Sequence, residues 1–283
     1  MSEAKLIRPS IDEIKSLLRV ERLPHIWCPS CGIGIVAKAY VEALLRSGIP
    51  PEKHVLVSGI GCSSRMPGYI KIDGYHVIHG RAIPFAVGLK TVRPELEVTV
   101  FAGDGDLSTI GGNHLIHAIR RNDDINVIMI NNFTYGMTGG QYGGTTPEGS
   151  RTLTSPYGHI EGTFNVPLLV ASIGAPYVAR WTVLHYRQIV DTIVEMFNID
   201  GFAFLEVISP CIIYTDMNRR DAISLMRMFR EQSDIDHKAD LRNIGINRLN
   251  EETRFVVGKF VHRPSESYQT KYRRLVEKVM KGG

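Results

Sequence analysis

The chain has 283 residues, of which 43% are hydrophobic and 22% are charged, and its formal net charge is +4. This composition is typical of a globular protein and excludes a disordered chain. Lys and Arg are scattered along the sequence, which argues against a nucleic-acid-binding protein. The N-terminus lacks an apolar run with a cleavage site, and no eighteen apolar residues run together. We therefore expect a soluble, cytoplasmic protein that contacts no membrane.

Short apolar runs rich in β-branched residues alternate with longer segments of helical period. In chain order, the predicted elements are a helix over 33–45, a strand over 54–59, a helix over 82–92, a strand over 97–103, a helix over 107–120, strands over 125–132 and 177–180, a helix over 184–197 and a strand over 202–209. This alternation predicts an α/β fold, a doubly wound and mainly parallel sheet with helices on both faces.

The alternation of apolar runs and helical segments weakens towards the C-terminus. We expect an α/β domain over residues 1–233, followed by a C-terminal extension or arm over residues 234–283, which are mostly polar and charged. Composition alone does not decide whether this arm lies on the surface of its own chain or wraps a partner subunit.

Four cysteines occur in the chain, at Cys28, Cys31, Cys62 and Cys211. The pair Cys28 and Cys31 forms a C-x-x-C motif, which alone fits a redox disulfide, half of a zinc site or half of an iron–sulfur site. A disulfide framework is typical of shorter secreted chains. Four thiolates match the ligand count of one zinc ion or one cluster, and the cysteines themselves do not separate the two metals.

Two neighbouring predicted strands end in polar clusters, Gly103-Asp104-Gly105 and Asn131-Asn132. Because the carboxyl ends of parallel strands meet at one edge of a sheet, we expect these clusters to lie together. The glycines allow a phosphate to approach the backbone, and a following helix presents free N–H groups to an anion. Carboxylate and amide oxygens suit Mg²⁺ or Ca²⁺ on a diphosphate. Each cluster alone is an ordinary turn, but together they favour a diphosphate site.

The paired clusters resemble the fingerprint of thiamine diphosphate enzymes, Gly-Asp-Gly followed by Asn-Asn. More widely, residues 23–211 resemble the β subunits of 2-oxoacid:ferredoxin oxidoreductases, in particular those of the 2-oxoglutarate type. The matching stretches are WCPSCGIG, GIGCSSR, HGRAIPFAVGLK, GDGDLSTIGGNH, NNFTYGMTGGQ and SPC. In that family, four matching cysteines hold one [4Fe-4S] cluster, which the resemblance implies for Cys28, Cys31, Cys62 and Cys211.

The resemblance also implies a thiamine diphosphate-binding fold and the residues of its site. Mg²⁺ would be held by Asp104, Asn132 and the carbonyl of Thr134. The cofactor contacts would be Ile60, Gly61, Cys62, Ser63, His79, Gly103, Asp104, Gly105, Asp106, Asn132, Thr134, Gly136, Met137 and Thr138. Arg65 would bind the substrate carboxylate, and His79 would contact the diphosphate or a reacting group. A solvated arginine and a structural histidine are the alternatives at these two positions.

The activity implied is the CoA-dependent oxidative decarboxylation of 2-oxoglutarate to succinyl-CoA and CO2 with reduction of ferredoxin, or the reverse carboxylation. Pyruvate or a broad range of 2-oxoacids is the alternative substrate. Relatives that act on 2-oxoglutarate are expected to carry Ser-Pro-Thr after Gln141, where this chain has Tyr142-Gly143-Gly144-Thr145. A non-redox decarboxylase or carboligase subunit that uses thiamine diphosphate, with zinc or nothing on its cysteines, is the next alternative. A non-catalytic metal-binding scaffold is the last.

The chain has no room for the pyrimidine-binding domain that thiamine diphosphate enzymes also need. The resemblance therefore implies an α subunit, or a fused α/γ subunit, in an α2β2 complex with the cofactor at the subunit interface. Ferredoxin, coenzyme A and the 2-oxoacid would be the further partners.

Overall fold

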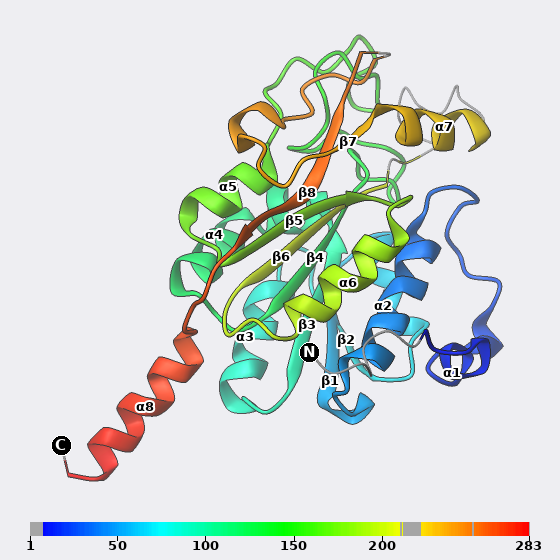
Figure 1. Cartoon of the computed structure of the whole chain (residues 1–283). Helices are drawn as coiled ribbons and strands as arrows, with labels where there is room; N and C mark the ends of the chain where they lie inside the picture. The colour runs from blue at the N-terminus through cyan, green and yellow to red at the C-terminus, as the bar shows by residue number, and fades with distance from the viewer. Residues whose placement is uncertain (1–7, 210, 212–221, 251, 283) are drawn as a thin grey trace.

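The computed structural model describes residues 8–209, 211, 222–250 and 252–282. Among these residues, eight strands form one sheet in the order β2-β1-β3-β4-β6-β5-β8-β7 (Figure 1). The strands are β1 (His54–Ser58), β2 (Asp73–His76), β3 (Glu97–Gly103), β4 (Asn126–Asn131), β5 (Tyr177–Thr182), β6 (Ala203–Ile208), β7 (Ser233–Ile235) and β8 (Phe255–His262). The six strands from β2 to β5 are parallel, and β8 runs antiparallel to β5.

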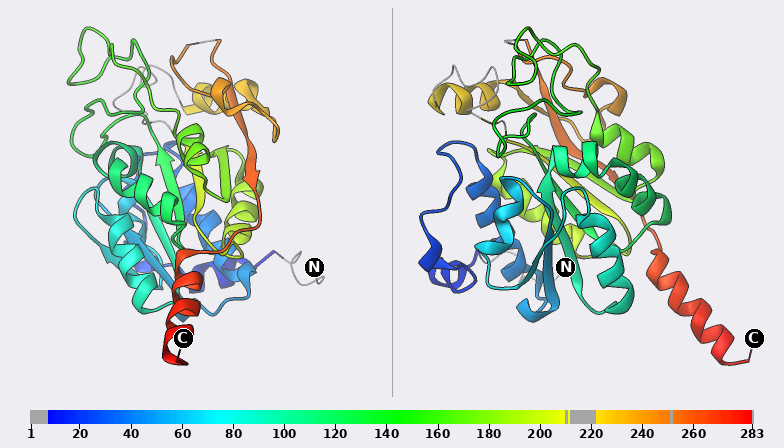
Figure 2. Two further views of the ribbon diagram at one scale, coloured as in Figure 1. Left: turned by 90° about the vertical axis from the view of Figure 1, so that its left-hand side faces the viewer. Right: turned by 180° about the vertical axis from the view of Figure 1, so that it is seen from behind.

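Helices cover both faces of the sheet (Figures 1 and 2). One face packs against α2 (Ile33–Ser47) and α6 (Tyr186–Met196), and the other packs against α3 (Ala82–Val92), α4 (Gly112–Arg121) and α5 (Val166–Ile173). The remaining α-helices are α1 (Ile11–Ser16), α7 (Ala222–Gln232) and α8 (Tyr268–Met280). The predicted doubly wound, mainly parallel α/β fold is confirmed.

Successive side chains of each central strand point to opposite faces of the sheet and divide the core into two layers. In β4, Ile128 and Ile130 belong to the layer under α2 and α6, whereas Val127 and Met129 belong to the opposite layer. Side chains on successive residues of a strand point to opposite faces, so a strand covered on both sides is apolar at every position. No helix of the described residues has the length and apolar character needed to cross a membrane.

The helix predicted over 107–120 is interrupted. A π-helix covers Gly105–Ile110, and α4 begins after Gly111. The backbone N–H of Gly111 donates to the carbonyl of Asp106 at 2.9 Å, and a Cβ at Gly111 would lie 2.5 Å from the same oxygen. Only glycine fits this approach, and π-helical turns are frequent at functional sites.

The segment after residue 233 is partly sheet. Phe255 and Val257 of β8 are buried, and β8 extends the sheet beyond β5. Beyond it, α8 projects from the body of the molecule (Figures 1 and 2). The expected arm is thus a sheet edge followed by a projecting helix, and the domain boundary at residue 233 stays a prediction.

The parallel strands β1, β3, β4 and β6 all end at one edge. The chain passes from β1 to β2 on one side and then returns to β3 on the other side of β1. Loops that leave neighbouring strands in opposite directions open a crevice at the carboxyl ends, which is where doubly wound folds bind ligands.

His54, the first residue of β1, provides a pH test of the core. The side chain is fully buried, and burial lowers its pKa to about 4. In the unfolded chain the pKa of this histidine is about 6.5. Protonation therefore favours the unfolded chain, so the free energy of unfolding is highest above pH 6.5 and falls as the pH drops from 6.5 towards 4. We expect about 3 kcal/mol of the free energy of unfolding to be lost over this range. His54→Leu removes this part of the pH dependence in urea unfolding, whereas His117→Gln, at an exposed position, retains it. Equal slopes for both variants would contradict the assignment.

Candidate cofactor site and cysteine cage

A cavity with an empty volume of about 480 Å³ opens at the carboxyl edge of the sheet. The loops after β1, β2, β3 and β4 supply its lining. All fourteen residues that the sequence analysis places in contact with thiamine diphosphate line this cavity, and Tyr135 is the remaining lining residue. The structure therefore brings these residues together, and their contacts with a cofactor stay predictions.

Three oxygen-bearing groups meet at one side of the cavity. The amide of Asn132 places one polar atom 3.0 Å from Oδ1 of Asp104 and 2.7 Å from the carbonyl oxygen of Thr134. If this atom is the amide nitrogen, it donates hydrogen bonds to both oxygens. If it is the amide oxygen, it lies next to two further oxygens. An octahedral Mg²⁺ with bonds of about 2.1 Å holds adjacent oxygens about 3 Å apart. The spacing therefore fits the predicted metal ligands.

Asp104 is buried at the end of β3, and burial raises the pKa of its carboxyl to about 6. Thr145 donates a hydrogen bond to Oδ2 of Asp104 and leaves Oδ1 facing Asn132. A bound cation would favour the ionised carboxylate. The sequence analysis assigned Thr145 no role at this site, because the hydrogen bond joins residues 41 positions apart in the chain.

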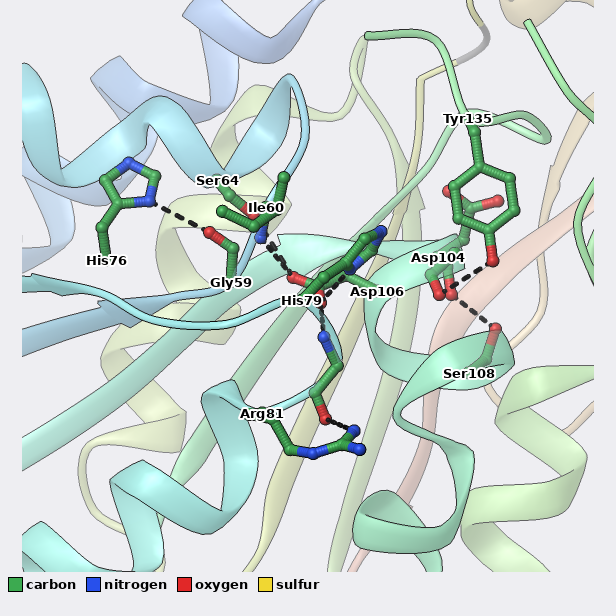
Figure 3. A network of polar contacts seen from close by, with 12 residues as sticks. Gly59, Ile60, Ser64, His76, His79, Arg81, Asp104, Asp106, Ser108 and Tyr135 are labelled. Atoms are coloured by element: carbon green, nitrogen blue, oxygen red, sulfur yellow. Dashed lines mark hydrogen bonds and ion pairs between the residues drawn. The ribbon is translucent and has the colours of Figure 1, made fainter. Parts of the chain in front are cut away.

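Asp106 joins the loops around the cavity (Figure 3). Its Oδ1 accepts from Nδ1 of His79 at 2.7 Å and from the backbone N–H of Gly80. Its Oδ2 accepts from the backbone N–H of Ile60 at 3.2 Å and from Oγ of Ser64 at 3.4 Å. One buried carboxylate therefore holds the loop after β1 and the loop before α3 against the π-helix.

Close approaches around this network require glycine at two positions. A Cβ at Gly59 would lie 2.1 Å from Oδ2 of Asp106, and a Cβ at Gly105 would lie 2.3 Å from the ring of Tyr135. The Tyr135 hydroxyl donates to the carbonyl of Gly105 at 3.3 Å, and its ring lies edge-on to His79 (Figure 3). Tyr135 thus closes the wall opposite the loop after β1.

A second cavity, with an empty volume of about 530 Å³, contains all four cysteines in its lining. Cys28 and Cys31 precede α2, Cys62 follows β1, and Cys211 follows β6. Residues far apart in the sequence therefore meet here. None of the four cysteines is joined in a disulfide, and all four line this one cavity; the cluster they are expected to hold stays a prediction.

Backbone contacts fix the cysteine positions. The carbonyl of Cys62 accepts from Nε1 of Trp27 at 2.7 Å, and the carbonyl of Cys31 accepts from Oγ of Ser209. The backbone N–H of Cys211 donates to the carbonyl of Asn132 at 3.3 Å. These bonds attach the cage directly to the ends of β4 and β6.

The charges of the thiols depend on one another. Burial raises the pKa of Cys31 to about 11, and repulsion from Cys28, Cys62 and Cys211 adds to this effect. Burial and repulsion from Cys211 and Cys28 also raise the pKa of Cys62. Thiolates at these sites therefore need positive charge close by, which bound iron or zinc supplies.

The two cavities share a wall formed by Cys62, Asn132 and Met137. A group bound by the oxygen set and a group bound by the cysteines would lie on either side of these residues. Of the two residues assigned to catalysis, His79 lines the first cavity, whereas Arg65 lies exposed on a 3-10 turn (Ser63–Gly68) and lines neither cavity.

Comparison with known proteins identifies the family. The family described as "Thiamine pyrophosphate enzyme, C-terminal TPP binding domain" matches residues 59–207. A protein of Methanocaldococcus jannaschii named 2-oxoglutarate synthase subunit KorB is 44% identical over 93% of this chain and 96% of its own length. A protein of Saccharolobus solfataricus named 2-oxoacid:ferredoxin oxidoreductase subunit beta is 39% identical over 69% of this chain and 65% of its own length. The chain belongs to the family of 2-oxoacid:ferredoxin oxidoreductase β subunits.

A solved member of this oxidoreductase family shares the fold. The structure, described as 2-oxoglutarate:ferredoxin oxidoreductase from Magnetococcus marinus with 2-oxoglutarate, coenzyme A and succinyl-CoA bound, matches with a TM-score of 0.83 and 28% identity. The match covers 99% of this chain and 94% of that chain. The family resemblance expected from the sequence motifs is thereby confirmed.

The Asp106 network gives a prediction for the site. Asp106→Asn replaces one acceptor oxygen with an NH2 group that faces N–H donors, so at least one loop contact is lost. We expect the free energy of unfolding to fall by about 1.5–3 kcal/mol, as for a hydrogen bond to a buried charge. We also expect weaker binding of thiamine diphosphate, measured by calorimetric titration. Asp73→Asn, at an exposed carboxylate of β2, serves as the control and should change stability by less than about 0.5 kcal/mol. Equal effects of the two substitutions would contradict the role of Asp106.

Proposed function

We propose that this chain is the β subunit of a 2-oxoglutarate:ferredoxin oxidoreductase, which converts 2-oxoglutarate and CoA to succinyl-CoA and CO2 and passes the electrons to ferredoxin. The observation that carries the proposal is the shared wall between an oxygen-lined cavity and a four-cysteine cavity. Family membership and the named relatives support the reaction. The reverse carboxylation uses the same site.

Thiamine diphosphate would occupy the first cavity with Mg²⁺ on Asp104, Asn132 and the carbonyl of Thr134. The oxygen spacing described above supports this assignment. Bound there, the cofactor supplies the stabilised carbanion that decarboxylation of a 2-oxoacid needs. The chain's own part is to orient the diphosphate through the loops after β3 and β4, which Asp106 and Thr145 hold in place.

The cysteine cavity would hold a [4Fe-4S] cluster, which accepts electrons one at a time. Each of the four cysteines would hold one iron of the cluster. The name of the Saccharolobus solfataricus relative, a 2-oxoacid:ferredoxin oxidoreductase subunit, supports a cluster, because an iron–sulfur centre passes single electrons and zinc has no redox chemistry.

Arg65 is proposed to bind the carboxylate of the substrate. The described residues contain no carboxylate that pairs with its guanidinium, and the 3-10 turn that carries it begins at the end of the cavity loop. A guanidinium binds a carboxylate through two parallel hydrogen bonds. His79, held by Asp106, presents Nε2 as its remaining polar ring atom in the cavity lining, which suits contact with the diphosphate or a reacting group.

A partner is needed to close the site. Ile60 and Met137 are apolar residues of the cavity lining and are 44% and 45% exposed. Apolar residues around a ligand site are typical of a surface that another subunit covers. An α or fused α/γ subunit with the pyrimidine-binding domain would cover it in an α2β2 complex, and we place this complex in the cytoplasm.

A broader substrate range is the alternative. The Saccharolobus solfataricus relative is named for 2-oxoacids in general, and the residues after Gln141 depart from the expected Ser-Pro-Thr. The departure lies in the loop that follows β4, a few residues after the last cavity-lining residue of that loop, Thr138, so it bears on the choice of substrate.

The test of the function is electron transfer by the assembled complex. The chain is co-expressed with its α subunit, purified without oxygen and assayed for ferredoxin reduction with CoA and either 2-oxoglutarate or pyruvate. We expect reduction that depends on CoA and thiamine diphosphate and is faster with 2-oxoglutarate. Faster reduction with pyruvate would support the broader alternative, and no reduction with any 2-oxoacid would contradict the proposal.

The cysteine cage gives a prediction about iron. Wild-type complex should contain about four irons per β chain, and Cys31→Ser should lose most of this iron together with the visible absorbance. Met137→Leu is the matched control, because it alters the shared wall without removing a thiol and should retain the iron. Zinc in the wild-type chain, or unchanged iron in Cys31→Ser, would contradict the cluster.

A further inference from the structure

A buried ion pair lies behind the loop that follows β4. Arg180 of β5 and Glu206 of β6 are register partners on neighbouring parallel strands, with 2% and 0% of their surfaces exposed. Nε of Arg180 donates to Oε2 of Glu206, and Nη1 of Arg180 donates to the carbonyl of Ile244 at 2.6 Å. Neither residue lines the cofactor cavity or the cysteine cavity.

The second oxygen of the Glu206 carboxylate points to β4. Oε1 accepts from Nδ2 of Asn131 at 2.8 Å. Glu206 is in register with Met129, and Asn131 lies two residues further along β4, so both polar side chains lie on the same face of the sheet. The other end of the Asn131 amide, Oδ1, accepts from the backbone N–H of Phe133 at 3.2 Å. The chain of contacts thus runs from Arg180 through Glu206 and Asn131 to the backbone of the loop.

Phe133 is the point at which this chain of contacts acts. It has a φ of 62°, in the left-handed region that residues other than glycine seldom adopt. Such a conformation persists when the surrounding contacts impose it. Phe133 lies between Asn132, whose amide faces Oδ1 of Asp104, and Thr134, whose carbonyl oxygen faces the same amide. The directions of this amide and this carbonyl therefore depend on the backbone turn at Phe133.

We propose that Glu206 is a positioning residue for the Mg²⁺ and diphosphate site, acting through Asn131 and the turn at Phe133. The proposal rests on the proposed function, since it assumes that this loop binds Mg²⁺. A carboxylate is required because it offers two acceptors, one for Arg180 and one for Asn131. With Nδ2 fixed on Glu206, the Asn131 amide has one orientation, and that orientation gives Phe133 its acceptor.

Two single substitutions and their combination test this role. In Glu206→Gln, the single side-chain oxygen accepts from Arg180, so the new amide NH2 faces the NH2 of Asn131 and one of these donors has no acceptor. In Asn131→Asp, two carboxylates face each other. In the double variant, the amide NH2 introduced at position 206 donates to one oxygen of the carboxylate introduced at position 131. The other carboxylate oxygen accepts from the backbone N–H of Phe133, so every donor has an acceptor again. The combination therefore separates a positioning role from general loss of stability.

The measurement is the Mg²⁺ concentration that half-saturates binding of thiamine diphosphate to the assembled complex, determined by equilibrium dialysis without substrate. We expect each single variant to raise this concentration about ten- to hundredfold, as for a lost hydrogen bond to a buried charge. We expect the double variant to return to within about threefold of wild type.

Asp124→Asn is the matched control. It breaks the ion pair between Nζ of Lys90 and Oδ2 of Asp124, which lie 2.8 Å apart. Asp124 precedes β4, at the end of the strand opposite the loop that follows it. We therefore expect Asp124→Asn to lower the stability of the chain and to leave the required Mg²⁺ concentration unchanged.

If Glu206→Gln yields no folded complex, Asn131→Ala removes the same contact from the other side, and we expect the same rise in the required Mg²⁺ concentration. Wild-type Mg²⁺ requirement in the single variants, or no recovery in the double variant, would overturn the proposal. Absence of Mg²⁺-dependent binding in the wild type would instead contradict the proposed function.

Discussion

The parallel alignment of β1, β3, β4 and β6 is the constraint on which the rest of the structure depends. Strands that run in one direction deliver their following loops to one edge, and the reversal of strand order beside β1 opens a crevice there. Each loop brings a different group: Cys62 after β1, Asp104 after β3, Asn132 after β4 and Cys211 after β6. An antiparallel sheet of the same residues would distribute these groups over two edges.

The oxygen-lined cavity and the cysteine-lined cavity form one structural unit. The end of β6 is bonded to the end of β4 through Ser209 and Asn131, and the next bond joins Cys211 to Asn132. Cys62 lines both cavities. A change in the loop after β4 therefore alters both cavities, which suits the proposed transfer of electrons from a cofactor in one cavity to a cluster in the other.

Much of this arrangement was predictable from the sequence. Apolar periodicity predicts the central strands and the buried face of α2, and the strand-end clusters predict where Asp104 and Asn132 meet. The resemblance supplied the cysteine set, which spacing alone left open between zinc and a cluster. The projecting α8 and strand β8 were not predicted, because β8 has a glycine and polar residues among its apolar ones.

The supporting contacts were the part that sequence reasoning missed. Thr145 meets Asp104 across 41 positions of the chain, and Glu206 meets Asn131 across 75. No local pattern marks such pairs, since a threonine in a glycine-rich loop and a glutamate in an apolar strand have many possible partners. The interruption before α4 likewise depends on one backbone contact at Gly111. These contacts are visible only when the strands are placed in register.

The most direct test of the account is an experimental structure of the assembled complex, prepared without oxygen in the presence of thiamine diphosphate and Mg²⁺, with anomalous scattering measured at the iron edge. The account predicts iron bound to Cys28, Cys31, Cys62 and Cys211 on one side of the shared wall. It predicts Mg²⁺ bound to Asp104, Asn132 and the Thr134 carbonyl on the other side. Iron away from these thiols, or a diphosphate metal held by other residues, would contradict it.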